Sequence, residues 1–329
     1  MVDTMQAGCE NESTMMRPAL VLAAALLLYP VLPALTQQAT SPATSQAAPA
    51  DPFPPVNPKF FDAIAPTTAD VDAFLKLIWG WDTNRSWRVE AIQKTQAPGV
   101  SKVTVFVADK SQGNKVDPVR FFTTPDGKFA IADSVFAFGP HPFEATAKVL
   151  AEQARGPAEG SASKSLLLVE FSDLQCPHCK EAAPVMENLK RDFPDARIVY
   201  QNYPLVEIHP FAYKAAAYGD CVAAAKGDAA FFTYMHDVFE HQDSLTPALA
   251  QQTLDAAVAK AGGSPAGVAA CSVTPATKAK VDAEIKLAEQ VGVDQTPMLA
   301  VNGHLMPLGG LPYETLKQIV AWDAKATAK

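Results

Sequence analysis

Two cysteines separated by two residues, Cys176 and Cys179, are the residues best suited to chemistry in this chain. An apolar run from Leu166 to Phe171 leads directly into them, and a segment compatible with a helix follows. A strand that delivers cysteines to the start of a helix places the first sulfur where unpaired backbone N–H groups point outward. These groups favour thiolate over thiol, so we expect Cys176 to be acidic, nucleophilic and partly exposed. Cys179, one turn further along, should be shielded and act as the resolving thiol.

Pro177 and His178 lie between the cysteines. Proline suits the first helical turn, where its missing N–H is not needed. His178 could be an ordinary exposed residue, but within the motif its imidazole would favour the Cys176 thiolate. If the pKa of Cys176 fell to about 5, the reduced form would gain roughly 2.7 kcal/mol at pH 7. That gain corresponds to about 60 mV, which predicts an oxidant rather than a reductant.

Two other roles of the cysteine pair are a structural disulfide and a zinc site. A structural disulfide across so short a loop would stabilise the fold little. A structural zinc site needs four ligands, and the sequence has no second Cys-x-x-Cys, so we assign no metal ligands. Redox chemistry is the interpretation that the spacing favours.

The tetrapeptide 176–179 resembles the active site of DsbA-type thiol–disulfide oxidoreductases, which have the thioredoxin fold. Glu170 lies six residues before the first cysteine, where this family has a buried acid. Its place in an apolar run also favours burial and a raised pKa, although a strand-edge carboxylate facing water is the alternative. The resemblance implies that Glu170 exchanges the proton of Cys179.

Thr296-Pro297 resembles the cis-proline loop of the same family. By itself the proline could be trans, since few X-Pro bonds in folded proteins are cis. The resemblance implies a cis bond that holds the Thr296 backbone beside Cys176, where it could pair with an extended substrate. Threonine before the proline also occurs in isomerase-type members.

The stretch 215–301 resembles the DsbA-like subgroup that carries a helical insertion and an extra pair of cysteines. Cys221 and Cys271 would form that pair. Two free buried cysteines are the alternative, but an oxidising compartment favours a structural disulfide. Closing a loop of about 50 residues would stabilise the fold by around 4 kcal/mol. His209, before Pro210, is expected to cap or pack rather than to take part in catalysis.

The N-terminal region indicates export. A short cationic start and an apolar run over 15–28 have the pattern of a signal peptide, with residues 1–14 as an upstream extension and cleavage near Thr36 or Ala39. An uncleaved membrane anchor is the alternative, but Pro30 and Pro33 keep the apolar run below the roughly 20 residues of a membrane span. Loss of Cys9 would leave four cysteines, an even number that suits a periplasmic or other extracytoplasmic space. Residues 37–58 should form a disordered linker.

The length of 329 residues allows two ordinary domains, and the net charge of −8 argues against nucleic acid as a partner. Residues 59–150 predict a small α+β domain, with a helix capped at Thr67 or Thr68, four strand-like runs and a hairpin turn at 125–128. Its order weakly resembles the N-terminal domain of DsbC/DsbG-type isomerases, which forms dimers in that family. Residues 151–164 are predicted to be a linker with a hinge at 156–160.

The predicted fold of 165–329 is α/β, a thioredoxin fold with a helical subdomain of four helices inserted at about 209–291. The expected order is strand, helix, strand, insertion, two strands and a helix. The predicted function is an exported thiol–disulfide oxidoreductase without a cofactor, acting on cysteines of substrate proteins and recycled by a membrane oxidase or a reductant. A dimeric disulfide isomerase or reductase, with 59–150 as the dimer interface, is one alternative. A non-catalytic chaperone that binds unfolded chains is another.

Overall fold

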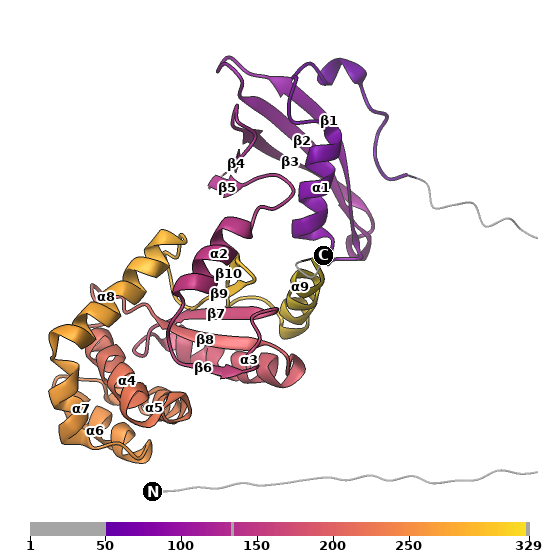
Figure 1. The fold of residues 1–329 in the computed structure, drawn as a ribbon. Coiled ribbons are helices and arrows are strands. Elements are labelled where there is room, and N and C mark those ends of the chain that lie inside the picture. Colours follow the sequence, from indigo (N-terminus) through magenta and orange to yellow (C-terminus); the bar gives the residue numbers. More distant parts are fainter. Residues whose placement is uncertain (1–50, 133–134, 327–329) are drawn as a thin grey trace, which may run out of the picture. The chain divides into compact units, whose positions relative to one another are not determined.

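The computed structural model describes residues 51–132 and 135–326 (Figure 1). The predicted upstream extension, signal peptide and most of the linker lie in residues 1–50, outside the described residues. Two five-stranded sheets organise the described part of the chain. No helix in that part is both long enough and apolar enough to cross a lipid bilayer.

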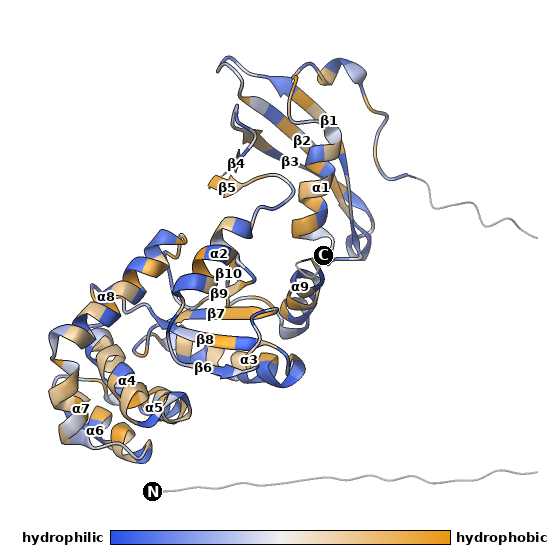
Figure 2. Cartoon of the chain, in the orientation of Figure 1, coloured by the Kyte–Doolittle hydropathy of each residue, from blue (hydrophilic) through white to orange (hydrophobic). Residues whose placement is uncertain are grey.

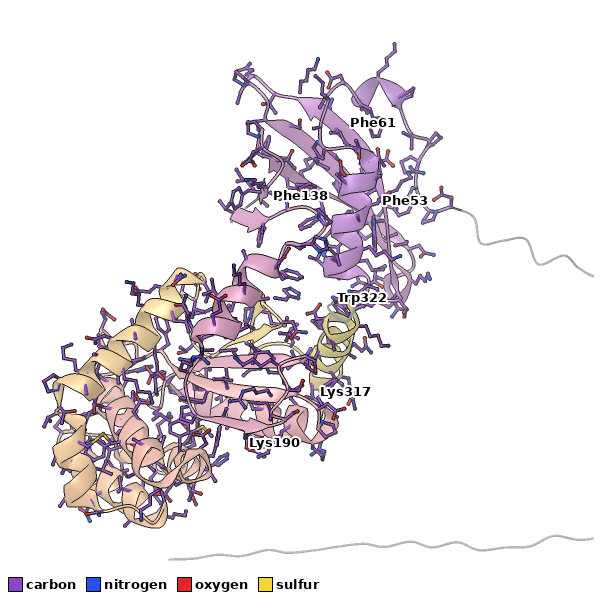
Figure 3. The ribbon with its side chains drawn as sticks, viewed as in Figure 1. Phe53, Phe61, Phe138, Lys190, Lys317 and Trp322 are labelled. Atoms are coloured by element: carbon purple, nitrogen blue, oxygen red, sulfur yellow. A yellow bond between two sulfur atoms is a disulfide. The ribbon has the colours of Figure 1, made fainter. Side chains whose placement is uncertain are left out.

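The first sheet is antiparallel, with strand order β1-β2-β3-β4-β5, and helix α1 (Thr68–Trp79) packs on it. Thr67 caps α1 as predicted, because its hydroxyl accepts the N–H of Asp70 and the Asp70 carboxylate accepts the N–H of Thr67. Phe138, labelled in Figure 3, lies in the core of this unit with its ring 4.8 Å from that of Phe74. The remaining elements are η1 (Pro58–Phe60), β1 (Arg85–Lys94), β2 (Ser101–Asp109), η2 (Lys110–Gln112), β3 (Lys115–Thr123), β4 (Phe129–Ile131) and β5 (Val135–Ala137). The predicted α+β arrangement is confirmed, with two short strands in place of one long final strand.

The second sheet has the order β10-β9-β7-β8-β6. Its centre is β7 (Leu167–Ser172), which is buried at every position, as expected of a strand covered on both faces. Strand β7 runs parallel to β8 and antiparallel to β9, and Figure 2 shows apolar residues in β7 and β8. The other elements are α2 (Glu144–Gln153), β6 (Ala158–Gly160), α3 (Pro177–Asp192), β8 (Arg197–Asn202), β9 (Met298–Val301), β10 (His304–Pro307) and α9 (Tyr313–Ala326).

The inserted subdomain lies between β8 and β9. It contains one α-helix more than the four predicted, because α7 was missed, and it also contains the short 3-10 helix η3. The helices are α4 (Ala212–Lys226), α5 (Asp228–Glu240), η3 (Gln242–Ser244), α6 (Ala250–Lys260), α7 (Pro265–Ser272) and α8 (Pro275–Gln290). The order β7, α3, β8, insertion, β9, β10, α9 is the thioredoxin fold with a helical insertion, as predicted.

The predicted linker over 151–164 is wrong in part. Ala158–Gly160 forms β6, which pairs antiparallel with β8 at the edge of the second sheet. Leu150, near the end of α2, packs in one cluster with Leu167 and Val169 of β7. The hinge signal of Gly156 and Gly160 was therefore misread. At Gly160 the backbone has φ 77°, and a side chain on Gly156 would collide with the Tyr200 carbonyl.

Candidate active site

The two cysteines stand at the junction of β7 and α3. Cys176 is the N-cap of α3 and Pro177 is its first residue, as predicted for a proline in the first turn. The Cys176 carbonyl accepts the N–H groups of Cys179 and Lys180, at 3.1 and 3.3 Å, which closes the first turn. Both cysteines are free thiols in this structure. The turn therefore places the two sulfurs at the positive end of the helix dipole.

The predicted partial exposure of Cys176 is wrong. Only 4 % of its surface is accessible, although Pro177 and His178 beside it are exposed. Cys176 packs in an apolar cluster with Leu174 and with Phe231 of the insertion, which explains the burial. Little of the Cys176 surface is therefore open to a substrate in this structure.

The pKa of the Cys176 thiol is lowered to about 5. The largest cause is a hydrogen bond from the Cys179 side chain, which burial partly opposes because a dry site disfavours charge. The side chain of Thr296 and the backbone N–H groups of Cys179 and His178 lower it further. A thiol with this pKa is almost fully ionised at neutral pH, as the motif predicted.

The pKa values of Cys179 and Glu170 are raised, in contrast to that of Cys176. Burial raises the pKa of Cys179 far above the usual thiol range, and the Cys176 thiolate beside it adds to the effect. Burial also raises the pKa of Glu170 to about 7, while contact with Ser172 lowers it and the charge of Glu159 raises it. The predicted burial of Glu170 is confirmed at 5 % exposure.

The His178 ring points into solvent, with 75 % of the side chain exposed, and its Nδ1 lies 3.1 Å from Glu181 Oε2. That contact is the first cause of a raised His178 pKa, and the Cys176 charge contributes. What His178 offers the thiolate directly is its backbone N–H. The ring is therefore placed to act on Cys176 only through long-range charge.

The bond between Thr296 and Pro297 is cis, as the resemblance implied. The Thr296 carbonyl lies 3.7 Å from the Cys176 sulfur, so residues 120 positions apart meet at the site. The hydroxyl of Thr296 is buried and forms no hydrogen bond of ordinary geometry within the described residues. It is nevertheless near enough to lower the pKa of Cys176.

Asp173, buried at 1 % exposure, anchors the turn before the cysteines, and sequence reasoning missed it. One carboxylate oxygen accepts the Gln175 N–H at 2.7 Å, and the other accepts the Leu205 N–H at 2.8 Å. The second oxygen also lies 2.8 Å from His209 Nδ1, so His209 packs against this anchor, as expected of it. The sequence signal that could have identified Asp173 is its position as a charged residue between the apolar strand and the Cys-x-x-Cys motif.

A second anchor, Gln242 of η3, was also missed. Its Nε2 donates to the carbonyls of Leu174 and Cys176, at 3.0 Å each, and the side chain is buried. Gln175 in turn accepts the N–H of Phe211 at 2.7 Å. The helical insertion thus contributes hydrogen bonds that hold the cysteine turn. No local sequence signal marks Gln242 for this role.

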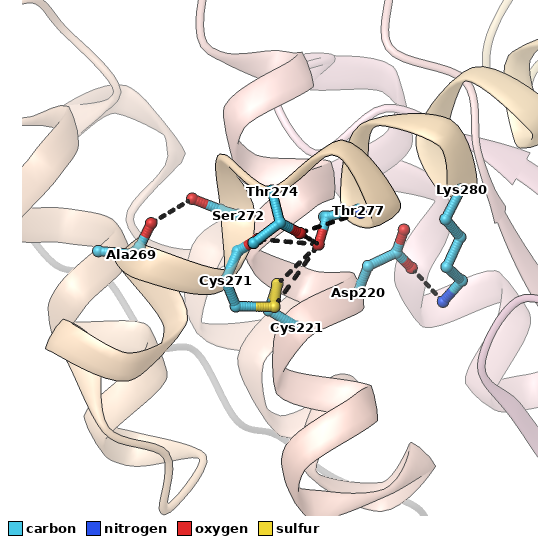
Figure 4. The surroundings of a disulfide bond; sticks show 8 residues. All are labelled: Asp220, Cys221, Ala269, Cys271, Ser272, Thr274, Thr277 and Lys280. Carbon is cyan, nitrogen blue, oxygen red and sulfur yellow. Dashed lines mark hydrogen bonds and ion pairs between the residues drawn. A yellow bond between two sulfur atoms is a disulfide. The ribbon is translucent and has the colours of Figure 1, made fainter.

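The predicted disulfide between Cys221 and Cys271 is present and joins α4 to α7 (Figure 4). The Thr277 hydroxyl lies 3.5 and 3.6 Å from the two sulfurs and donates to the Cys271 carbonyl at 2.9 Å. Next to it, Lys280 Nζ of α8 lies 2.7 Å from the buried carboxylate of Asp220 in α4. The bridge and the ion pair therefore fasten two helices to α4.

Side chains that could bind a metal ion cluster away from the two active-site cysteines. In the described ranges, the group of three or more such residues within reach of one another is Asp237, Glu240 and His241. Lys260 already lies 2.6 Å from Asp237 there. Cys176 and Cys179 belong to no such group, so the zinc alternative has no further ligands among the described residues.

Known proteins resemble parts of the chain. The Na(+)/H(+) antiporter NhaA 1 of Salinispora arenicola is 38 % identical over 98 residues, which are 30 % of this chain and 14 % of the antiporter. The chain thus spans about a seventh of that relative's length. A periplasmic thioredoxin-like protein from Salmonella enterica serovar Typhimurium is 23 % identical, with TM-score 0.46, over 56 % of this chain and 97 % of that one. Oxidised BdbD from Bacillus subtilis is 19 % identical, with TM-score 0.46, over 52 % of this chain and 93 % of that one.

The TM-scores are low, so the assignment depends on the observed topology and on a match of the whole domain to a sequence family. A sequence model of the thioredoxin family matches residues 153–321, just over half of the chain. That span begins at the end of α2 and contains both sheet partners of β7, the cysteine turn and the cis proline. The chain therefore belongs to the thioredoxin family.

Proposed function

We propose that the chain is a DsbA-like thiol–disulfide oxidoreductase that forms or exchanges disulfides in substrate proteins through Cys176 and Cys179. The strongest support is that the pKa values of two thiols within one helical turn are shifted in opposite directions. The pKa of Cys176 is lowered to about 5, and burial raises that of Cys179. At neutral pH one sulfur is a thiolate and the other a thiol, which are the states required of a nucleophile and a resolving group.

In the oxidising direction, a substrate thiolate attacks the Cys176 sulfur of the Cys176–Cys179 disulfide. A bond forms between the substrate and Cys176, and Cys179 leaves and takes up a proton. A second substrate thiolate then attacks the substrate sulfur of this mixed disulfide, and Cys176 leaves. Its low pKa makes Cys176 a good leaving group, so the equilibrium favours an oxidised substrate and a reduced enzyme.

The Thr296 backbone supports this reaction by its position. Its carbonyl lies 3.7 Å from the Cys176 sulfur, immediately before β9. An extended substrate segment could donate a main-chain N–H there while its cysteine meets Cys176. Such pairing reads the substrate backbone rather than its side chains, and so suits many different client proteins.

Export, recycling and assembly belong to the same proposal. The Cys221–Cys271 disulfide is of a kind that persists in oxidising compartments, which supports a periplasmic or other extracytoplasmic location. Each oxidation leaves both active-site thiols reduced, so a redox partner must remove two electrons before the next cycle. Homodimerisation through 59–150 remains a prediction that sedimentation of the purified chain would check.

Trapping tests the proposal directly. Cys179→Ser removes the resolving thiol, so clients should accumulate as mixed disulfides on Cys176 and be released by a reductant. The matched control is Cys176→Ser. Its one remaining active-site thiol is Cys179, which burial keeps protonated. In glutathione buffers the wild-type pair should be oxidising, by about 60 mV relative to a pair whose first thiol titrates normally.

Two results would contradict the function. One is equal capture by both variants, which would mean that Cys176 has no special reactivity. The other is a strongly reducing equilibrium with glutathione. A non-catalytic chaperone would instead retain its binding of unfolded chains in both variants and show no captured clients.

A further inference from the structure

The hydroxyl of Ser172 is a buried polar group that has no role in the thiol–disulfide exchange steps. Ser172, the last residue of β7, has 0 % exposure, and its Oγ forms no hydrogen bond of ordinary geometry within the described residues. Buried hydroxyls usually have partners, because an unpaired one costs free energy. A group in this state at the base of a reactive site calls for an explanation.

Ser172 lies between two titratable side chains. Residues two apart on a strand share a face, so Ser172 and Glu170 point to the same side of β7. The Cys179 sulfur lies 3.4 Å from the backbone nitrogen of Asp173, the residue after Ser172. Contact with the Ser172 hydroxyl lowers the pKa of both Glu170 and Cys179. The hydroxyl is thus within interaction range of both. It also contacts the buried hydroxyl of Tyr200 in β8, whose pKa burial raises well above the usual tyrosine range.

Cys179 must exchange a proton in every cycle, yet it has no direct access to water. Its side chain is 0 % exposed, and burial raises its pKa. Glu170 keeps 5 % exposure, and burial raises its pKa to about 7. Near neutral pH the Glu170 carboxyl can therefore give or take a proton, and only it among these groups has any opening to solvent.

We propose that the Ser172 hydroxyl relays a proton between the Cys179 sulfur and the Glu170 carboxyl. This inference rests on the proposed function of the same site. When Cys179 attacks a mixed disulfide on Cys176, its proton passes to the Ser172 oxygen while the Ser172 proton passes to the Glu170 carboxylate. The new bond joins the sulfurs of Cys176 and Cys179, and the client or small thiol leaves with the electron pair. In the oxidising direction both protons move the opposite way.

The relay and a simple space-filling role predict different outcomes for Ser172→Ala. Removing a buried hydroxyl that has no hydrogen bond should leave the fold as stable as before or more stable. A space-filling serine would leave the chemistry unchanged as well. A relay would slow only the steps in which Cys179 gains or loses its proton.

The experiment follows the oxidation of the reduced full chain by glutathione disulfide, with acid quenching and mass spectrometry. The first step, attack by Cys176, forms a mixed disulfide with glutathione and does not involve the Cys179 proton. The second step, ring closure by Cys179, does. In Ser172→Ala we expect an unchanged first step and closure slowed about 10²-fold, the usual size of acid–base assistance, so that the mixed disulfide accumulates.

Two further variants separate the relay from packing. Ser172→Thr keeps a hydroxyl on the strand and should restore closure. Ser101→Ala is a distant control. It removes a buried strand hydroxyl of the other sheet, one that donates to the Ala65 carbonyl, and it should change neither step. In the wild type the closure rate should rise with pH through the pKa of Glu170, and this inflection should vanish in Ser172→Ala.

Each outcome has one meaning. Closure at the wild-type rate in Ser172→Ala would overturn the relay, as would slow closure in a Ser172→Thr variant of wild-type stability. An intact pH inflection in Ser172→Ala would do the same. A wild-type chain that forms neither the mixed disulfide nor the Cys176–Cys179 bond would instead overturn the proposed function itself.

Discussion

The largest single contribution to the low pKa of Cys176 should come from its neighbour in the same turn. Relative to an ordinary thiol of about 8.5, a pKa of about 5 represents nearly 5 kcal/mol in favour of the thiolate. The Cys179 side chain is the largest single cause. A hydrogen bond to a charged group contributes about 1.5–3 kcal/mol, or about one to two pKa units. In Cys179→Ala we therefore expect a Cys176 pKa of about 6–7.

The control is Cys179→Ser, whose hydroxyl can still donate to the thiolate, so the Cys176 pKa should stay near the wild-type value. Both variants carry Cys9→Ser, which leaves Cys176 as the single free thiol beside the Cys221–Cys271 disulfide. The measurement is thiolate absorbance, or the rate of alkylation, as a function of pH. A wild-type pKa in Cys179→Ala would refute the reasoning and assign the shift to the helix N-terminus. An equal rise in both variants would refute the hydrogen-bond explanation.

Stability should follow the same titration. Because the folded pKa of Cys176 lies below its unfolded value, the reduced protein gains stability from the thiolate. This contribution is complete above the unfolded pKa and is lost as the pH falls through about 5. At pH 7 it amounts to roughly 2.7 kcal/mol. Urea unfolding of the reduced form at several pH values measures it, and a pH-independent midpoint between 5 and 8 would contradict it.

Three further changes test how the site and the insertion are held. Gln242→Leu removes both hydrogen bonds to the cysteine turn and leaves the buried Leu174 carbonyl without this partner, which should cost about 1–3 kcal/mol in urea unfolding. An unchanged unfolding midpoint would show that the turn does not need this anchor. Cys271→Ser should cost about 4 kcal/mol for a loop of roughly 50 residues, with the Cys176 pKa unchanged; a shifted pKa would mean that the bridge tunes the site. Burial raises the pKa of Glu284 to about 8, so the folded state favours the protonated carboxyl. This contribution to stability is fully present below the pKa of the unfolded chain and is lost as the pH rises toward 8. Glu284→Gln should therefore stabilise the fold at pH 8 and have little effect at pH 4, and equal effects at both would contradict the assignment.

Elements that depend on local patterns were predicted well. The capping residue Thr67, the apolar run of β7 and the turn between β3 and β4 are each encoded within a few residues, so no distant contact is needed to recognise them. Elements with a weak local pattern were missed. β6 has only three residues, and its pairing with β8 creates it. Helix α7 has only eight residues, and its start signal, an N-cap at Ser264 followed by Pro265, was overlooked.

By itself the sequence determined which residues we propose to react. The cysteine spacing, the helix that follows and the threonine–proline pair are all written in short segments, and they specify a thiolate at a helix start. Only the tertiary structure decided the surroundings of that thiolate. The buried state of Cys176, the hydrogen bonds from Gln242 and the anchor between Asp173 and His209 join residues 36 to 68 positions apart. Such contacts form when packing excludes water, and no pattern along the chain records which groups will then meet.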